Sequence, residues 1–216
     1  MLLKYKTVIF DLDGTLAESA PGVVASAKHA LAVMGLPYPA ELPDNTLIGP
    51  PLRYSFQHSL GVGADRLEEA IGLYRVRYAD LGIREAKLYP GVEELLAGLR
   101  AAGACICLAT SKYSVMTEIM LDHFQIRHFF DYLSMSDGTE MVSSKKKLLQ
   151  NVLEATATPP EKAVMIGDTR FDAEGARETG VPFIGVLYGY GSRREMEEQG
   201  GRVFANSVPD LGNLLL

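Results

Sequence analysis

The sequence predicts an α/β fold: a doubly wound parallel sheet that carries a small, all-helical cap inserted after its first strand. Two observations support it. Apolar runs of strand length alternate with stretches of helical periodicity over most of the chain. A region near the N-terminus breaks this alternation, because it has helical patterns and no apolar strand among them. We therefore predict a core domain formed by residues 1–16 and 85–216, and a cap domain formed by residues 17–84.

The first predicted strand begins at Thr7 and ends before Asp11. Its β-branched and aromatic residues are typical of a strand that is buried on both faces. Further apolar runs predict strands at 104–109, about 131–135, 162–167 and 183–187.

Helical periodicity between these runs predicts helices at about 91–102, 113–123, 145–156 and 171–179. Several of their boundaries carry residues that start or stop helices. Pro90-Gly91 opens the first helix, Gly103 ends it and Gly180 ends the last one. Strands that alternate with helices in this way imply a parallel sheet with right-handed crossovers.

The predicted cap has helix-like stretches at 18–35, 52–60 and 64–82, and the proline-rich stretch 37–51 divides it in two. An insertion at the carboxyl end of the first strand lies over the edge where open α/β sheets bind ligands. We expect the cap to act as a lid over that edge.

Composition limits the classes of partner. The net charge of −6 disfavours a nucleic-acid surface. No apolar run approaches the roughly 20 residues of a membrane helix. Lys4 and Lys6 are followed so soon by Asp11 that we expect no signal peptide. Cys105 and Cys107 lie in an apolar strand and are expected to be core thiols, as in a cytoplasmic protein without disulfides.

Four polar motifs follow predicted strands or begin predicted helices. They are Asp11-Leu12-Asp13-Gly14-Thr15, Thr110-Ser111-Lys112, Lys145-Lys146-Lys147 and Gly167-Asp168-Thr169-Arg170-Phe171-Asp172. Because the carboxyl ends of parallel strands meet at one edge of the sheet, we expect all four motifs to gather there.

Together these residue types suit phosphoryl transfer. The carboxylates of Asp11, Asp168 and Asp172 form a hard-oxygen set that Mg²⁺ prefers. A hydroxyl from Thr110 or Ser111, with nearby backbone N–H groups, would hold phosphoryl oxygens. A lysine would neutralise charge, one aspartate would attack phosphorus, and the second aspartate of the first pair would protonate the leaving group and then activate water.

The order of these motifs resembles the haloacid dehalogenase-like hydrolase superfamily, and the resemblance spans the whole chain. The segment Tyr89-Pro90-Gly91-Val92 resembles the phosphoglycolate phosphatase-like group with a small helical cap. The segments 48–52 and 185–191 look like a branch labelled phosphoglycolate phosphatase or 5′-nucleotidase. The resemblance implies a Rossmann-like core, an aspartyl-phosphate intermediate and Mg²⁺ as the cofactor.

The resemblance also implies roles for the first two motifs. Asp11 would be the nucleophile and a Mg²⁺ ligand. Asp13 would be the general acid and base, and its backbone carbonyl would bind the same ion. Thr110 and the N–H of Ser111 would bind the transferring phosphoryl group, for which we also name Gly14.

In the last two motifs, the resemblance implies that Asp168 is a direct metal ligand and that Asp172 acts close by or through a water. Many relatives have a Lys-Pro pair where this chain has three lysines. Successive helical residues diverge by about 100°, so only one of the three should enter the site. We choose Lys145, with Lys146 as the alternative and Lys147 directed elsewhere.

Arg53 follows the Gly49-Pro50-Pro51 turn in the predicted cap, and we name it as a candidate contact for an anionic substrate tail. Lys112 is expected to face solvent.

The sequence therefore predicts a phosphatase that acts on small phosphorylated metabolites, most simply a phosphoglycolate phosphatase. A 5′-nucleotidase and a phosphomutase are the alternatives within the enzyme class, and a non-catalytic sensor on the same scaffold is another. A signalling receiver domain is disfavoured because both aspartates lie at the first strand and a helical insertion follows. We expect a monomer or a homodimer.

Overall fold

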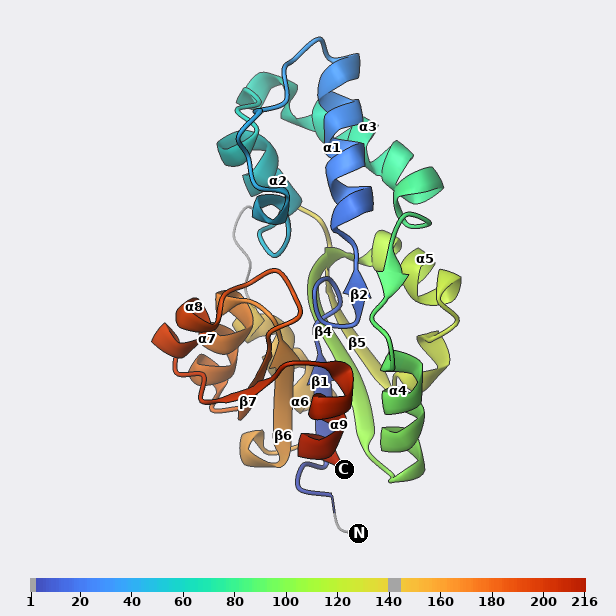
Figure 1. Ribbon diagram of the computed structural model, residues 1–216, viewed down its shortest axis with the longest axis vertical. Coiled ribbons are helices and arrows are strands. Elements are labelled where there is room, and N and C mark those ends of the chain that lie inside the picture. Colours follow the sequence, from blue (N-terminus) through green and yellow to red (C-terminus); the bar gives the residue numbers. More distant parts are fainter. Residues whose placement is uncertain (1–2, 140–144) are drawn as a thin grey trace.

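The computed structural model describes residues 3–139 and 145–216. Its main sheet has six parallel strands in the order β5-β4-β1-β6-β7-β8 (Figure 1). β1 lies inside the sheet, between β4 and β6. The strand bounds are β1 Thr7–Phe10, β4 Cys105–Tyr113, β5 Tyr132–Ser136, β6 Ala163–Gly167, β7 Phe183–Val186 and β8 Val203–Ala205.

Helices cover both faces of the sheet, because its strands are apolar on both sides. Alternate residues of β1 enter different clusters: Val8 and Phe10 pack on one face and Ile9 on the other. The first face packs against α4 (Val92–Ala101), α5 (Ser114–His123) and α9 (Val208–Leu215), and the second against α6 (Lys145–Thr156) and α7 (Arg170–Thr179). Short elements complete the core: η5 (Arg127–Phe129), η6 (Pro160–Lys162) and α8 (Arg193–Glu198).

The segment between residues 20 and 82 is helical and lies over one end of the sheet, opposite the two chain termini (Figure 1). Its two long helices, α1 and α3, pack against each other. The bounds are α1 Ala20–Val33, η1 Asp44–Leu47, α2 Leu52–Tyr54, η2 Ser55–Ser59, η3 Ala64–Arg66, α3 Leu67–Arg77 and η4 Tyr78–Gly82. The elements η2 and η4 are single π-helical turns that continue α2 and α3.

A short antiparallel ribbon joins this helical segment to the core. It pairs β2 (Ala17–Glu18) with β3 (Lys87–Leu88). The sequence predicted no strand here, because two residues are too few to show a periodic pattern.

Two other differences from the sequence prediction affect the core. β4 continues four residues beyond the predicted end at 109, since its polar end still pairs with β5 through Thr110 and Tyr113. The edge strand β8 and helix α9 were not predicted. Within the described ranges, no helix combines the length and the apolar character that crossing a membrane requires.

Candidate active site

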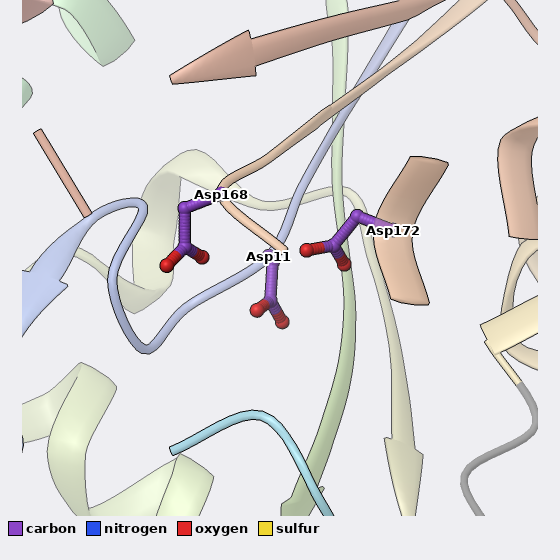
Figure 2. Close-up of side chains that lie close together, drawn as sticks. All are labelled: Asp11, Asp168 and Asp172. Atoms are coloured by element: carbon purple, nitrogen blue, oxygen red, sulfur yellow. The ribbon is translucent and has the colours of Figure 1, made fainter. Parts of the chain in front are cut away.

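Three buried carboxylates converge at the carboxyl end of the central strands. Asp11 directly follows β1, Asp168 directly follows β6, and Asp172 lies in the first turn of α7. One oxygen from each lies within 4.8 Å of the others, and Figure 2 shows Asp168 and Asp172 on either side of Asp11. Asp11 is 6% exposed and the other two residues are fully buried. The sequence therefore located correctly the edge at which these side chains meet.

The cluster has more negative charge than the protein itself neutralises. Burial raises the pKa of Asp11 to about 6, although Lys145 opposes this shift. Burial, followed by repulsion from Asp172 and Asp11, raises the pKa of Asp168 to about 8. Carboxylates that are buried together favour a bound cation, and a set made only of oxygen atoms suits Mg²⁺. The residues present therefore fit the expected metal.

Both oxygens of Asp172 have protein partners. Oδ2 accepts from the backbone N–H of Thr169 at 3.0 Å and from its hydroxyl at 2.7 Å, which forms a capping box at the start of α7. Oδ1 lies 2.7 Å from Nζ of Lys145. These contacts hold the Asp172 carboxylate between the start of α7 and the Lys145 ammonium group.

Lys145 is the one of the three consecutive lysines that enters the cluster. It begins α6 and is 5% exposed. Its Nζ lies 3.0 Å from Asp11 Oδ1, 2.9 Å from the carbonyl oxygen of Ala109 and 2.7 Å from Asp172 Oδ1. Burial alone would lower its pKa, but Asp11 and Asp172 raise it, so the ammonium group stays charged. Lys146 instead points toward Glu178, with its side chain 48% exposed.

Gly14 allows the loop after β1 to contact Asp168. Its φ of +82° is a left-handed conformation that favours glycine, and a Cβ at this position would overlap the Asp168 carboxylate. That carboxylate also accepts from the Thr15 hydroxyl at 3.2 Å and from the N–H of Tyr190 at 2.8 Å. The structure thus shows a positioning role for Gly14, which the sequence analysis named only for phosphate binding.

A cavity of about 90 Å³ opens above the cluster, between the core and the helical segment. Asp11, Asp13, Thr110, Ser111 and Lys145 all line it, whereas the predicted site residues Gly14, Asp168 and Asp172 are not among its lining residues. The helical segment contributes Val23, Leu47, Ile48, Tyr74, Arg75 and Tyr78 to the opposite wall.

The expectation that Lys112 faces solvent was wrong. Its side chain is 9% exposed, and Nζ donates to the Asp13 carboxylate at 3.0 and 3.1 Å. Nζ also donates at 2.8 Å to the phenol oxygen of Tyr78, a residue of the helical segment. The predicted strand ended at 109, whereas β4 continues to Tyr113 and carries both Thr110 and Lys112 into the lining of the cavity.

Arg53 is not among the residues that line this cavity. Its Nη1 forms an ion pair with Glu68. The arginine that does line the cavity is Arg75, from α3, and the sequence analysis did not single it out.

The family model described as haloacid dehalogenase-like hydrolase matches residues 8–186. The chain belongs to this family. A 5′-nucleotidase of Pseudomonas aeruginosa is 37% identical over 196 residues, which cover 90% of this chain and 88% of that protein. A phosphoglycolate phosphatase of Caulobacter vibrioides is 31% identical and is matched over 95% of this chain and 88% of its own length.

The solved structures agree on the fold. A predicted phosphatase from Clostridium acetobutylicum superimposes with a TM-score of 0.88 at 35% identity, over 97% of both chains. The tyrosine-protein kinase PtkA of Mycobacterium tuberculosis is 38% identical over 85% of this chain, but the match spans 62% of that longer protein. The family and its phosphatase relatives identify the present protein as a phosphatase of the haloacid dehalogenase-like type.

Proposed function

We propose that this protein is a Mg²⁺-dependent phosphatase that hydrolyses small phosphomonoesters through a phosphorylated Asp11. One observation carries the proposal: the Asp11 carboxylate lies at the floor of a cavity, beside Asp168 and within 3.0 Å of the Lys145 ammonium group. A nucleophilic carboxylate needs such neighbours, because a cation at the reaction centre reduces its repulsion from the phosphate.

Asp11, Asp168 and the backbone carbonyl of Asp13 are the groups that would hold the metal. When bound, Mg²⁺ supplies positive charge that offsets the carboxylates and the substrate phosphate. Thr110 and the N–H of Ser111 would orient the phosphoryl group, and Lys145 would stabilise charge as it develops.

In the first half-reaction, an oxygen of Asp11 forms a bond to phosphorus as the bond to the leaving oxygen breaks. Asp13 gives its proton to that leaving oxygen. In the second, the Asp13 carboxylate takes a proton from water, whose oxygen attacks phosphorus and releases Asp11 and inorganic phosphate. The helical segment covers the cavity and would exclude other water during attack.

We propose 2-phosphoglycolate as the leading substrate, and a 5′-nucleotide as the second candidate. What supports both is similarity to relatives that carry those two names. A phosphate-release screen over a panel of phosphorylated metabolites, with Mg²⁺ and with a chelator, tests the proposal.

We expect release that requires Mg²⁺ and is lost in Asp11→Asn while the variant stays folded. Wild-type rates in Asp11→Asn would refute the assignment of Asp11. An isomeric phosphate ester in place of free phosphate would indicate a mutase, and no turnover of any compound would favour a non-catalytic sensor.

A further inference from the structure

We infer that Arg75 forms a second anion subsite in the catalytic cavity, so that the preferred substrates are phosphomonoesters with a carboxylate or a second phosphate. The inference rests on the proposed function, because it assumes that the first anion is the phosphoryl group at Asp11. It assigns to Arg75 the contact that the sequence analysis gave to Arg53.

Arg75 is held in a fixed orientation on the cavity wall. Its Nη2 donates to the carbonyl oxygen of Gly138 at 2.9 Å, and its guanidinium lies over the ring of Tyr113, with Cζ 4.2 Å from the ring centroid. Both contacts come from the core, whereas Arg75 belongs to α3. A guanidinium fixed in this way loses little further freedom when it binds a ligand.

The other two cations that line the cavity already have enough acceptors. An ammonium group has three donors. Lys145 Nζ lies within 3.0 Å of three oxygens, from Asp11, Ala109 and Asp172. Lys112 Nζ lies within 3.1 Å of both Asp13 oxygens and of the Tyr78 hydroxyl. Both ammonium groups are therefore directed at groups of the site itself and not at a distant group of the substrate.

Arg75 differs because its charge has no carboxylate partner among the ion pairs of the described residues. Its Nε is buried and has no hydrogen-bond partner among residues 3–139 and 145–216. A buried donor without a partner is costly and requires an explanation. Carboxylates and phosphates match the planar fork of a guanidinium, so an anion of either kind would satisfy it.

Arg53 provides a natural comparison in the same helical segment. Its Nε is also buried, and none of the described residues forms a hydrogen bond with it. Its charge, however, is paired with Glu68, and it is not among the residues that line the catalytic cavity. The charge of Arg75 also lowers the pKa of Glu68, but it contributes less than the hydrogen bond and the charge of Arg53. The two arginines therefore differ mainly in location and in carboxylate pairing.

The remaining cavity wall indicates what joins the two anions. Its aliphatic and aromatic members include Val23, Leu47, Ile48, Leu52, Met116 and Phe171. Such a wall suits a short carbon body. The ligand class is therefore a small phosphorylated acid or a bisphosphate.

The test compares substrates that differ in the second anion alone. One pair is 2-phosphoglycolate and 2-hydroxyethyl phosphate, and the other is propane-1,3-diol bisphosphate and propyl phosphate. We would measure kcat/KM for each in the wild type, Arg75→Met and Arg53→Met, with p-nitrophenyl phosphate as a reference without a second anion.

In at least one pair, we expect the wild type to have a higher kcat/KM for the compound with the second anion. Which pair shows this preference identifies the second anion as a carboxylate or a phosphate. Arg75→Met should reduce that preference about 10- to 100-fold, the range for a charged hydrogen bond, and should slow p-nitrophenyl phosphate, which has no second anion, less than it slows the anionic substrates. Arg53→Met should keep the preference. Equal rates within both pairs, or an unchanged preference in Arg75→Met, would overturn the inference.

Binding of non-hydrolysable compounds separates this inference from the proposed function. Phosphonoacetate carries a carboxylate, propane-1,3-bisphosphonate carries a second phosphonate, and ethylphosphonate carries neither. Calorimetry with Mg²⁺ should show tighter binding of one of the first two than of ethylphosphonate, and loss of that difference in Arg75→Met alone. If no compound is hydrolysed but this binding difference is present, the proposed function fails and the subsite stands; equal binding of all three rejects the subsite.

Discussion

The ammonium group of Lys112 lies 3.0 Å from the carboxylate of Asp13, and the hydroxyl of Tyr78 lies 2.8 Å from the same nitrogen. Lys112 and Asp13 belong to the core, whereas Tyr78 begins the π-helical turn that follows α3. The contact thus links the helical segment to the side chain that we propose as the general acid. Its consequence is that Asp13 is held in one place when the segment covers the cavity.

The first prediction concerns this link. In Lys112→Met, Asp13 loses its partner and is less well placed to protonate a leaving group. Hydrolysis of an alkyl phosphate, which has a poor leaving group, should slow by about 10-fold or more. Hydrolysis of p-nitrophenyl phosphate needs little protonation and should change much less. Rates for the two substrates, measured side by side, check this.

Lys146→Met is the matched control, because that side chain is 48% exposed and points toward Glu178. It should behave as the wild type with both substrates. If Lys112→Met slowed both substrates to the same extent, the positioning role would be rejected.

The second prediction distinguishes the consecutive lysines. Lys145→Met should lower kcat by about 10²- to 10³-fold, as expected when one charged group at the reaction centre is removed. It also leaves Asp11 and Asp172 without the cation between them, so Mg²⁺ should increase the free energy of unfolding more in this variant than in the wild type. Steady-state kinetics of Lys145→Met and Lys146→Met check the assignment, and a larger loss in the second variant would contradict it.

The third prediction separates backbone strain from crowding at Asp168, a proposed metal ligand. Gly14 and Gly103 have φ values of +82° and +83°, but a Cβ would overlap Asp168 at the first position and meets no atom within 4 Å at the second. Both alanine variants should lose about 1–2 kcal/mol of stability from the left-handed backbone. Gly14→Ala alone should raise the Mg²⁺ concentration for half-maximal activity, by about 10-fold.

Denaturation curves and Mg²⁺ titrations of the two variants provide the measurement. An unchanged Mg²⁺ requirement in Gly14→Ala would show that the loop has room to move away from Asp168.

The fourth prediction follows from the buried carboxylates. The pKa of Asp11 is raised to about 6 and that of Asp168 to about 8, from ordinary values near 3.8. Between about pH 4 and pH 8 these two carboxylates therefore hold more protons in the folded, metal-free protein than in the unfolded chain. The protein's free energy of unfolding should fall as pH rises through this range, by at most about 1.4 kcal/mol per pH unit for each proton.

Asp168→Asn keeps the shape of the side chain but has no charge to bury, so its stability should decline less steeply with pH. Mg²⁺ should restore the wild type most strongly near pH 8. Urea denaturation at several pH values, with a chelator and with Mg²⁺, tests both statements. Parallel pH profiles for the two proteins would show that Asp168 is not the source of the effect.

The sequence predicted the parts of the fold that rest on local pattern. β1, β6 and β7 are short apolar runs, and α6 carries an apolar stripe, so their periodicity is visible without tertiary information. The short strands β2, β3 and β8 could not be recognised, because two or three residues show no period and their pairing depends on distant segments.

The site shows the same division. Asp11, Asp168 and Lys145 could be placed from the ends of predicted elements, because the topology of a parallel sheet brings those ends together. Lys112 was misplaced because the predicted strand ended too early. Arg75 could not be chosen over Arg53, because only tertiary packing shows that Glu68 neutralises one arginine and that the cavity receives the other.

The most direct test of the account is to trap phosphate on Asp11. In Asp13→Asn, p-nitrophenyl phosphate should still transfer its phosphoryl group, because its leaving group needs no acid, whereas the second step lacks the base that activates water. Mixing enzyme and substrate should release a burst of about one nitrophenolate per enzyme. After reduction with borohydride, peptide mass spectrometry should find homoserine at position 11. No burst, or an unmodified Asp11 after it, would contradict the mechanism.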